Sequence, residues 1–369
     1  MKLLDTLHRW TGGLLGLVLA LLGLTGTILL YRDALVMLPH SDDAQVQETV
    51  LLAEVTQRLM ANPGQRPQSI VFASSQFGLD RLTYKGGAGA YVTQSGDPVA
   101  AWSSQWERPE LWLFDFHHHL FAGDTGETVI GIAALCGLFF VVSGTVLWWR
   151  TRRTFQLRVL PARMSRPAIV RHHRDVGIVT APLLALSLLT GAVLVFRPMT
   201  AVLFGPGAPQ EIEAALASPP PRRASVARDL DWGGLIRAAR ERFPDAEVRG
   251  LSLPRRGDGI IAVRMRSPGE WLPNGRTTVW FAADTGQLIA ARDAAELSGT
   301  VKAFNTLYPL HAGKVGGLAY RVAMSISGIA MTLLGTLAVW SFWFARSRRG
   351  AQARSRDGGR TACRTAGIS

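Results

Sequence analysis

Four long apolar runs, separated by two long polar segments, constrain the fold of this chain more than any other feature. They lie at roughly 9–31, 127–149, 175–196 and 318–344. A helix needs about 20 apolar residues to cross the hydrocarbon core, and in lipid the backbone must satisfy its own hydrogen bonds. The sequence therefore predicts an α-helical integral membrane protein with four transmembrane helices rather than a soluble enzyme.

The first apolar run is predicted to be a retained helix rather than a secretory signal peptide. Its apolar region is longer than that of a signal peptide, and Tyr31-Arg32-Asp33 after it offers no small-residue cleavage site. All four runs are thus counted as membrane spans.

The charge of the chain is concentrated beside these spans. The formal net charge is +13, and the basic residues, nearly all arginine, crowd the segments 150–174 and 346–364. Such placement indicates membrane topology, not a nucleic-acid-binding face. By the positive-inside rule both segments and both termini are expected in the cytoplasm. The predicted location is the bacterial inner membrane, with no nucleic-acid partner.

The two polar segments are then expected in the periplasm as two α+β domains. In the first, a helix-like stretch at 44–61 precedes β-rich runs near 68–74, 79–85 and 90–94; in the second, a helix at 231–243 precedes runs near 247–253, 259–266 and 277–282. The predicted order is helix 1–31, domain 32–116, helix 117–150, basic loop 151–171, helix 172–197, domain 198–306, helix 307–345 and basic tail 346–369.

An internal duplication relates the two halves. At an offset of 165 residues, His8-Arg9 matches His173-Arg174 and Leu24-Thr25-Gly26 matches Leu189-Thr190-Gly191. The second and fourth spans correspond more weakly at an offset of 191, for example through Gly144 and Gly335. The protein is therefore predicted to be two copies of helix, outer domain, helix.

Histidines stand before the spans in a pattern that suggests haem ligation. His8 and His173 precede the two spans that begin on the cytoplasmic side, and His117-His118-His119 and His311 precede the two that begin outside. Imidazole is a good iron ligand, and a haem between helices needs small residues beside it and cations for its propionates. Candidates for those roles are Gly12, Gly16, Gly177, Gly123, Gly126, Gly313 and Gly316, and Arg9, Arg174 and Arg321.

Simpler interpretations stay open. A juxtamembrane histidine is often an interfacial polar residue, and glycines also serve close helix packing. His40, His118 and His172 have no counterpart in the repeat and are expected at the surface or behind the ligands. Cys136 lies in an apolar run and Cys363 in the basic tail, so neither a disulfide framework nor a cysteine-based metal site is expected.

Several motifs together resemble the PepSY-associated transmembrane proteins, also described as PiuB-like or iron-regulated membrane proteins. The motifs are Leu7-His8-Arg9-Trp10, His117-x-x-Leu120 with Gly123 and Gly126, Ser143-Gly144 with Leu147-Trp148-Trp149, His173-Arg174-Asp175-x-Gly177, and Pro309-Leu310-His311-x-Gly313. The resemblance covers almost the whole chain, and it implies that the outer segments are PepSY domains.

The resemblance further implies a FoxB-type ferrisiderophore reductase that carries two haem b groups. His8 and His173 would ligate the haem near the cytoplasmic face, and His117 and His311 the haem near the periplasmic face. His119 is kept as a substitute for His117 because it lies closer to the repeat register of His311. The partners would be a ferric siderophore, membrane lipid, and quinol or a cytoplasmic reductase as electron donor, since the chain lacks a convincing dinucleotide fingerprint.

Two other functions remain as alternatives. The chain could be a haem-free membrane-anchored protein whose PepSY domains bind or regulate a periplasmic partner. It could also be an electron-transfer subunit for another periplasmic acceptor. Colourless protein would support the first, and haem without ferrisiderophore reduction would support the second. A transporter is less expected, because the spans carry almost no central ionisable residues.

Overall fold

The computed structural model describes residues 2–158, 160–254 and 258–365, with side chains described as far as Trp343. The chain divides into two compact units. The helix unit comprises Met1–Leu30, Phe116–Phe196 and Gly316–Ser369, and the sheet unit comprises Tyr31–Asp115 and Arg197–Val315. The side chains of the predicted basic tail, 346–369, lie outside the described residues.

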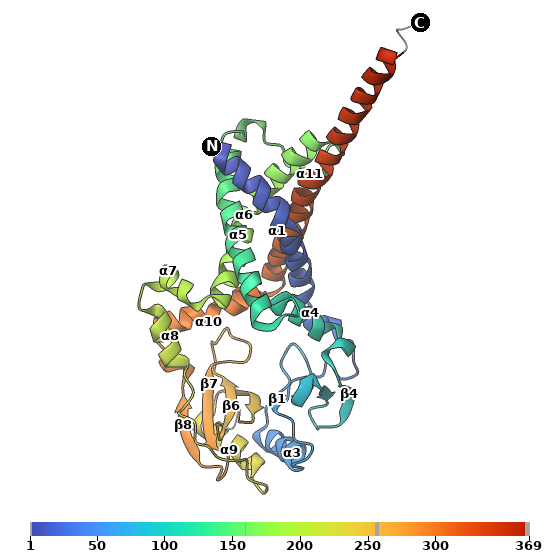
Figure 1. The fold of residues 1–369 in the computed structure, drawn as a ribbon. Coiled ribbons are helices and arrows are strands. Elements are labelled where there is room, and N and C mark those ends of the chain that lie inside the picture. Colours follow the sequence, from blue (N-terminus) through green and yellow to red (C-terminus); the bar gives the residue numbers. More distant parts are fainter. Residues whose placement is uncertain (1, 159, 255–257, 366–369) are drawn as a thin grey trace. The chain divides into compact units, whose positions relative to one another are not determined.

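The helix unit contains the four predicted spans. They are α1 (Lys2–Leu29), α5 (Gly123–Trp149), α6 (Arg166–Val195) and α11 (Gly317–Thr365), and in α11 the part Gly317–Trp343 is long and apolar enough to cross a membrane. Helix α1 packs along α11 and α5 along α6, and contacts of α6 with α11 and of α1 with α5 complete the bundle (Figure 1).

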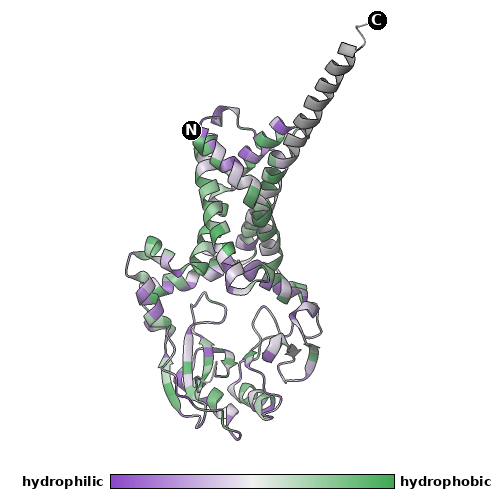
Figure 2. Cartoon of the chain, in the orientation of Figure 1, coloured by the Kyte–Doolittle hydropathy of each residue, from purple (hydrophilic) through white to green (hydrophobic). Residues whose placement is uncertain are grey.

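The outer surface of this bundle is apolar, as a lipid-facing surface must be. Leu14 is 60% exposed, and Val142 is 65% exposed. Hydrophobic residues follow the spanning helices along their length (Figure 2). Exposed apolar side chains on this scale mark a surface that contacts lipid rather than water. The chain is therefore a multi-pass membrane protein.

Glycines allow α1 and α11 to approach closely. A Cβ atom on Gly16 would lie 2.8 Å from the carbonyl oxygen of Gly335, and one on Gly23 would lie 2.6 Å from that of Gly328. Both distances are too short for a real contact, so the two helices pack backbone against backbone. Small residues at such positions are typical of closely packed membrane helices. For Gly16, helix packing alone explains why the residue is glycine, and no cofactor is needed for that explanation.

This packing makes Gly16→Ala a disruptive substitution. We expect it to destabilise the bundle by about 1–3 kcal/mol, because the added methyl group must push α1 away from α11. The matched control is Gly12→Ala, one turn earlier on the same helix, where the nearest atom to a new Cβ is 3.8 Å away. Thermal unfolding in detergent should show a clear loss for Gly16→Ala and little change for Gly12→Ala. Equal effects would contradict the packing assignment.

Spans α5 and α11 each follow a separate shorter helix. The sequence had instead predicted continuous helical segments that begin at 117 and 307. Helix α4 (Pro109–His119) ends in the histidine triplet, and α10 (Gly299–His311) ends in His311. A turn follows each helix. Leu120 and Phe121 have φ values of 48° and 60° in the first turn, and Gly313 and Gly316 have 62° and 67° in the second. Left-handed backbone cannot continue an α-helix, so the chain bends at both places.

The sheet unit is built on one antiparallel sheet of eight strands, in the order β4-β3-β2-β1-β5-β6-β7-β8 (Figure 1). The strands are β1 (Ser69–Val71), β2 (Asp80–Thr83), β3 (Gly89–Val92), β4 (Pro98–Trp102), β5 (Glu247–Ser252), β6 (Ile260–Arg266), β7 (Thr277–Ala282) and β8 (Leu288–Arg292). The first four come from one half of the duplication and the last four from the other. Strands β1 and β5 join the halves, with Ile70 opposite Leu251.

One hydrophobic core serves both halves of this sheet. Helices α3 (Thr49–Met60) and α9 (Trp232–Arg242) pack against each other, and their buried residues share the core with Ile70, Leu251 and Val263. Trp232 is fully buried there. The two outer segments, predicted as two domains, thus form a single sheet whose halves share this core, and a smaller apolar cluster of Val36, Leu79, Tyr91 and Trp102 lies in the first half. The physical reason is that joining β1 to β5 satisfies the backbone of two strands that would otherwise be exposed edges.

The remaining helices are short and connect these elements. They are α2 (Arg32–Leu35), α7 (Thr200–Phe204) and α8 (Ala208–Leu216). Helix α8 packs on α10. The Pro-rich stretch at 218–221 has no regular secondary structure.

A buried carboxyl group in this sheet predicts a pH dependence of stability. Asp80 is 2% exposed; its Oδ1 accepts a hydrogen bond from the backbone N–H of Ala73 (2.7 Å), and its Oδ2 has no hydrogen-bond partner. Burial raises the pKa of Asp80 from 3.8 to about 7, although the Ala73 N–H and Arg249 act in the opposite direction. Between these two pH values the unfolded chain loses the proton and the folded chain keeps it, so stability falls as pH rises.

Asp80→Asn, which keeps a neutral side chain of the same shape, should remove this fall. We expect the melting temperature of the wild type to drop by several degrees from pH 5 to pH 8, and that of Asp80→Asn to drop much less. The same drop in both proteins would show that Asp80 is ionised in the folded state across this range.

Candidate functional site

Two of the predicted histidines meet inside the helix unit. His8 lies near the start of α1 and His173 near the start of α6, so the duplicated helices place equivalent residues together. Their ring centroids are 6.4 Å apart and the ring planes are nearly perpendicular, at 88°. Phe140 of α5 packs edge-on against His8, with a centroid distance of 5.4 Å. The structure therefore brings together the pair that the repeat predicts.

The spacing of these two rings suits two axial ligands of one iron. Imidazole bonds metals at about 2.0–2.1 Å, so two rings on opposite sides of one metal have centroids roughly 6 Å apart. Nδ1 of His8 lies 2.7 Å from the hydroxyl of Ser143, which leaves Nε2 for a ligand. Nδ1 of His173 is buried without a hydrogen-bond partner. A buried nitrogen without a partner is costly, and these residues fit haem ligation.

Another predicted ligand, His117 of α4, contacts the other end of α1. Nδ1 of His117 is 3.0 Å from the hydroxyl of Thr25, and a Cβ atom on Gly26 would lie 3.0 Å from its Cε1. The rings of His118 and His119 follow, with successive centroid distances of 5.8 and 6.0 Å. Because Thr25 follows His8 by 17 residues on one helix, the two histidine positions are separated by roughly 25 Å along the axis. That distance is comparable to the thickness of the hydrocarbon core.

His311 is the last residue of α10 and belongs to the sheet unit, whereas His117 belongs to the helix unit. The pairing of these two histidines therefore stays a prediction. The helix ends bear on the choice between His117 and His119. Helix α4 ends at His119 as α10 ends at His311, which favours the His119 register. The ring of His117, however, contacts Thr25 of α1. Both remain candidates, and helix ends vary by one or two residues.

The predicted propionate-binding arginines differ in their surroundings. Arg9 lies 3.7 Å from Asp5 in an exposed pair. Arg174 lies 2.7 Å from the buried carboxylate of Asp175 and also contacts Thr154, so it fixes the loop after α5 to α6. Arg321 lies half-buried near the start of α11. Arg174 is thus engaged with the protein, and Arg9 is the better placed of the two cytoplasmic-side candidates to reach an added anion.

The predicted glycines divide into two groups. At Gly12 and Gly177 a new Cβ would meet its nearest atom only at 3.8 and 3.9 Å, so both leave room beside the histidines. At Gly126 a Cβ would overlap the backbone oxygen of His119, so this glycine is required by the turn between α4 and α5. Gly123, Gly313 and Gly316 have positive φ values and belong to the turns that precede the spans.

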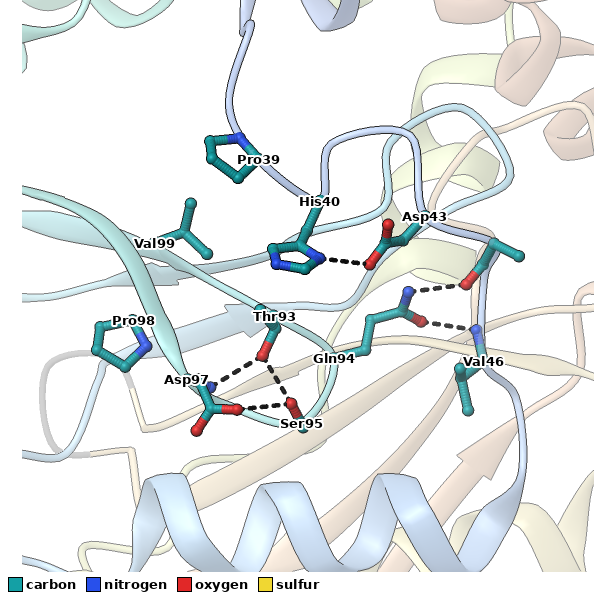
Figure 3. A pocket seen from close by; sticks show the side chains of 11 residues that line it. Pro39, His40, Asp43, Val46, Thr93, Gln94, Ser95, Asp97, Pro98 and Val99 are labelled. Carbon is teal, nitrogen blue, oxygen red and sulfur yellow. Dashed lines mark hydrogen bonds and ion pairs between the residues drawn. The ribbon is translucent and has the colours of Figure 1, made fainter.

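The remaining histidines lie elsewhere. His172 is only 5% exposed, so it is buried rather than at the surface. His40 lines a cavity of about 750 Å³ in the sheet unit (Figure 3). Its Nδ1 lies 2.9 Å from a carboxylate oxygen of Asp43, and the Gln94 side chain ties the two walls by hydrogen bonds to Ala44 and Val46. Within the described residues, no group of three or more His, Cys, Asp or Glu side chains is arranged to hold a metal ion.

The sequence did not predict that Ser143 contacts His8 or that Thr25 contacts His117. Ser143 belongs to the motif Ser143-Gly144, and Thr25 belongs to the repeated triplet Leu24-Thr25-Gly26. For Thr25 the repeat itself was a signal, because the triplet places a hydroxyl near the end of each duplicated helix. A hydrogen bond to its second nitrogen usually fixes the orientation of a ligating imidazole.

Comparison with known families gives one match. The family model described as PepSY-associated TM region matches residues 6–346. No curated protein matches the chain. The match covers α1 from Thr6 onward, all of α5 and α6, the apolar part of α11, the whole sheet unit and the four predicted ligand histidines.

Proposed function

Because the chain belongs to the PepSY-associated transmembrane family, we propose that it is a di-haem reductase of the bacterial inner membrane that reduces ferric siderophores. His8 and His173 are the proposed axial ligands of one haem b. The second haem is proposed at His117, with His311 as the second ligand on the sequence argument alone. The observation that carries the proposal is the pair His8 and His173, from equivalent positions of duplicated spanning helices, with ring centroids 6.4 Å apart.

The residues around this pair support an electron-transfer role. Haem b, when bound, supplies reversible one-electron chemistry, and two histidine ligands favour electron transfer over oxygen activation. Ser143 fixes the orientation of the His8 ring, and Phe140 covers it from α5. Thr25 holds His117 in the same way at the other end of α1. The chain thus supports one ligand position near each end of its first span.

The proposed substrate is the iron of a siderophore complex. Iron(III) bound by hard oxygen ligands accepts one electron and becomes iron(II), for which those ligands have lower affinity. Quinol or a separate cytoplasmic reductase supplies the electron in this proposal. The proposed orientation, with the termini in the cytoplasm, rests on the arginines of segment 150–174.

Reconstituted vesicles test this proposal. Haem-loaded protein in sealed vesicles, with a reductant trapped inside, is expected to release iron(II) from an external ferric siderophore, and a colorimetric iron(II) chelator measures it. Vesicles that carry the His173→Ala variant should give only the background rate. Haem-loaded protein that is oxidised by another acceptor but never by ferric siderophores would instead support the electron-transfer subunit.

A further inference from the structure

A cluster of arginines lies on the face of the sheet opposite the core. Arg264 of β6 is directly across from Thr278 of β7, which is directly across from Arg292 of β8. Residues that are paired across antiparallel strands lie on one face, and Arg276, two residues before Thr278, belongs to that face by strand periodicity. The alternate residues Val263 and Val279 point to the core. Three arginines of the second half therefore share one surface.

These arginines are anchored by neutral groups. Nε of Arg276 donates to the side-chain oxygen of Asn305 in α10 at 2.9 Å, and Arg292 donates to the carbonyl of Ala217. The guanidinium of Arg292 also stacks over Trp280, 4.7 Å from the ring centroid. Within the described residues, neither Arg276 nor Arg292 forms an ion pair with a carboxylate. Their positions are fixed, but their charges are not neutralised by these contacts.

The electrostatics of Arg276 show that the charges are close together. Burial, together with repulsion by Arg264, Arg292 and Arg197, lowers the pKa of Arg276 to about 10, and the charge of Glu270 acts in the opposite direction. The carboxylate of Glu270 already accepts the backbone N–H groups of Ser267 and Arg276. Of the charges that act on Arg276, three are cationic and one, the carboxylate of Glu270, is already engaged with the backbone. Partly buried like charges are unfavourable unless a counter-charge joins them.

The first copy of the repeat differs at this point. Arg32 and Arg197 are equivalent at the offset of 165, but Arg32 is followed by Asp33 and Arg197 by Pro198. Asp33 of the first copy forms an ion pair with Lys314 of the second, and Glu110 forms one with Arg108 within the first copy. The second copy has kept the basic residue and has proline where the first copy has a carboxylate. At this position the second copy therefore lacks the carboxylate that the first copy has.

From this arrangement we infer that Arg264, Arg276, Arg292 and Arg197 form a binding site for a multivalent oxyanion, a ligand that carries carboxylate or phosphate groups. Guanidinium groups bind both kinds of group through paired hydrogen bonds. The ligand is either a small water-soluble anion or the phosphate of a lipid headgroup, because Arg197 follows the end of span α6 at Val195 by two residues. The inference needs no haem and stands apart from the proposed reductase activity.

Thermal stability of the full-length protein tests this site. In neutral detergent, millimolar citrate or inorganic phosphate is expected to raise the melting temperature by roughly 3–5 °C over chloride at equal ionic strength. Arg292→Gln and Arg276→Gln should each lose more than half of that shift. The matched control is Arg242→Gln, an exposed arginine of α9 beside Phe243, which should keep it.

A second arm separates the two sources of the anion. In nanodiscs, a headgroup site predicts that phosphatidylglycerol stabilises the wild type but not Arg292→Gln, relative to phosphatidylcholine, and that citrate adds nothing once that lipid is present. A site for a soluble ligand predicts the citrate shift in both lipids. The inference is overturned if neither anion nor lipid stabilises the wild type beyond chloride, or if Arg292→Gln responds as the wild type does. If Arg276→Gln does not fold, the response of Arg292→Gln alone decides whether the inference stands.

Discussion

Replacing His173 with alanine is expected to remove about one haem from a protein that otherwise carries about two. The ring centroids of His173 and His8 are 6.4 Å apart, and Nδ1 of His173 is buried without a hydrogen-bond partner. Alanine removes the proposed ligand and leaves a void between α6 and its neighbours. His8→Ala is expected to have the same effect, because both histidines are proposed to ligate one iron. Haem per chain, measured by pyridine haemochrome assay on purified variants, gives the result.

Two further substitutions sharpen this test. His40→Ala changes an exposed histidine of the sheet unit and should leave the haem content unchanged. Ser143→Ala removes the hydroxyl that orients His8, so it should retain haem with roughly 10–100-fold weaker binding. A His173→Ala protein with the wild-type amount of haem and an unchanged low-spin spectrum would contradict the assignment.

Ile70→Ala in the first half of the sheet is expected to destabilise the second half as well. Ile70 is 1% exposed, and it lies opposite Leu82 on one side and Leu251 on the other, at the junction of the two halves. Truncation of a buried isoleucine costs about 2–5 kcal/mol. Because one core spans both halves, the whole unit should open together. Backbone amides of β6 and β7 should then exchange with solvent roughly 30-fold faster or more.

Hydrogen exchange followed by mass spectrometry measures this coupling. Val50→Ala, on the exposed side of α3, is the control and should leave exchange in β6 and β7 unchanged. Faster exchange confined to peptides of β1–β4 in the Ile70→Ala protein would show that the two halves are independent domains, as the sequence had predicted.

The spans and the histidine pair were predictable because their signals are local or repeated. An apolar run of about 20 residues specifies a membrane helix by itself. The match of His8-Arg9 with His173-Arg174 placed two potential ligands at equivalent helix starts. Helices α3 and α9 and most strands also followed from periodicity. In each case the relevant information lies within one segment or in its direct copy.

The shared sheet and the breaks before α5 and α11 were not predictable in this way. The pairing of β1 with β5 joins residues about 180 positions apart, and no local pattern announces such a contact. Strands β4 and β8 are short and rich in alanine, so their β-propensity is weak. The turn after α4 uses Leu120 and Phe121 at positive φ, where glycine or asparagine would have given a signal. The contacts of Ser143 and Thr25 likewise depend on how helices pack.

The absorption spectrum of the purified wild-type protein, oxidised and then reduced with dithionite after expression with ample haem, decides whether the chain binds haem. We expect about two low-spin haem b groups per chain, with sharp bands on reduction. A folded but colourless protein would contradict this expectation, and the chain would then be best explained as a haem-free membrane protein whose sheet unit binds or regulates a partner.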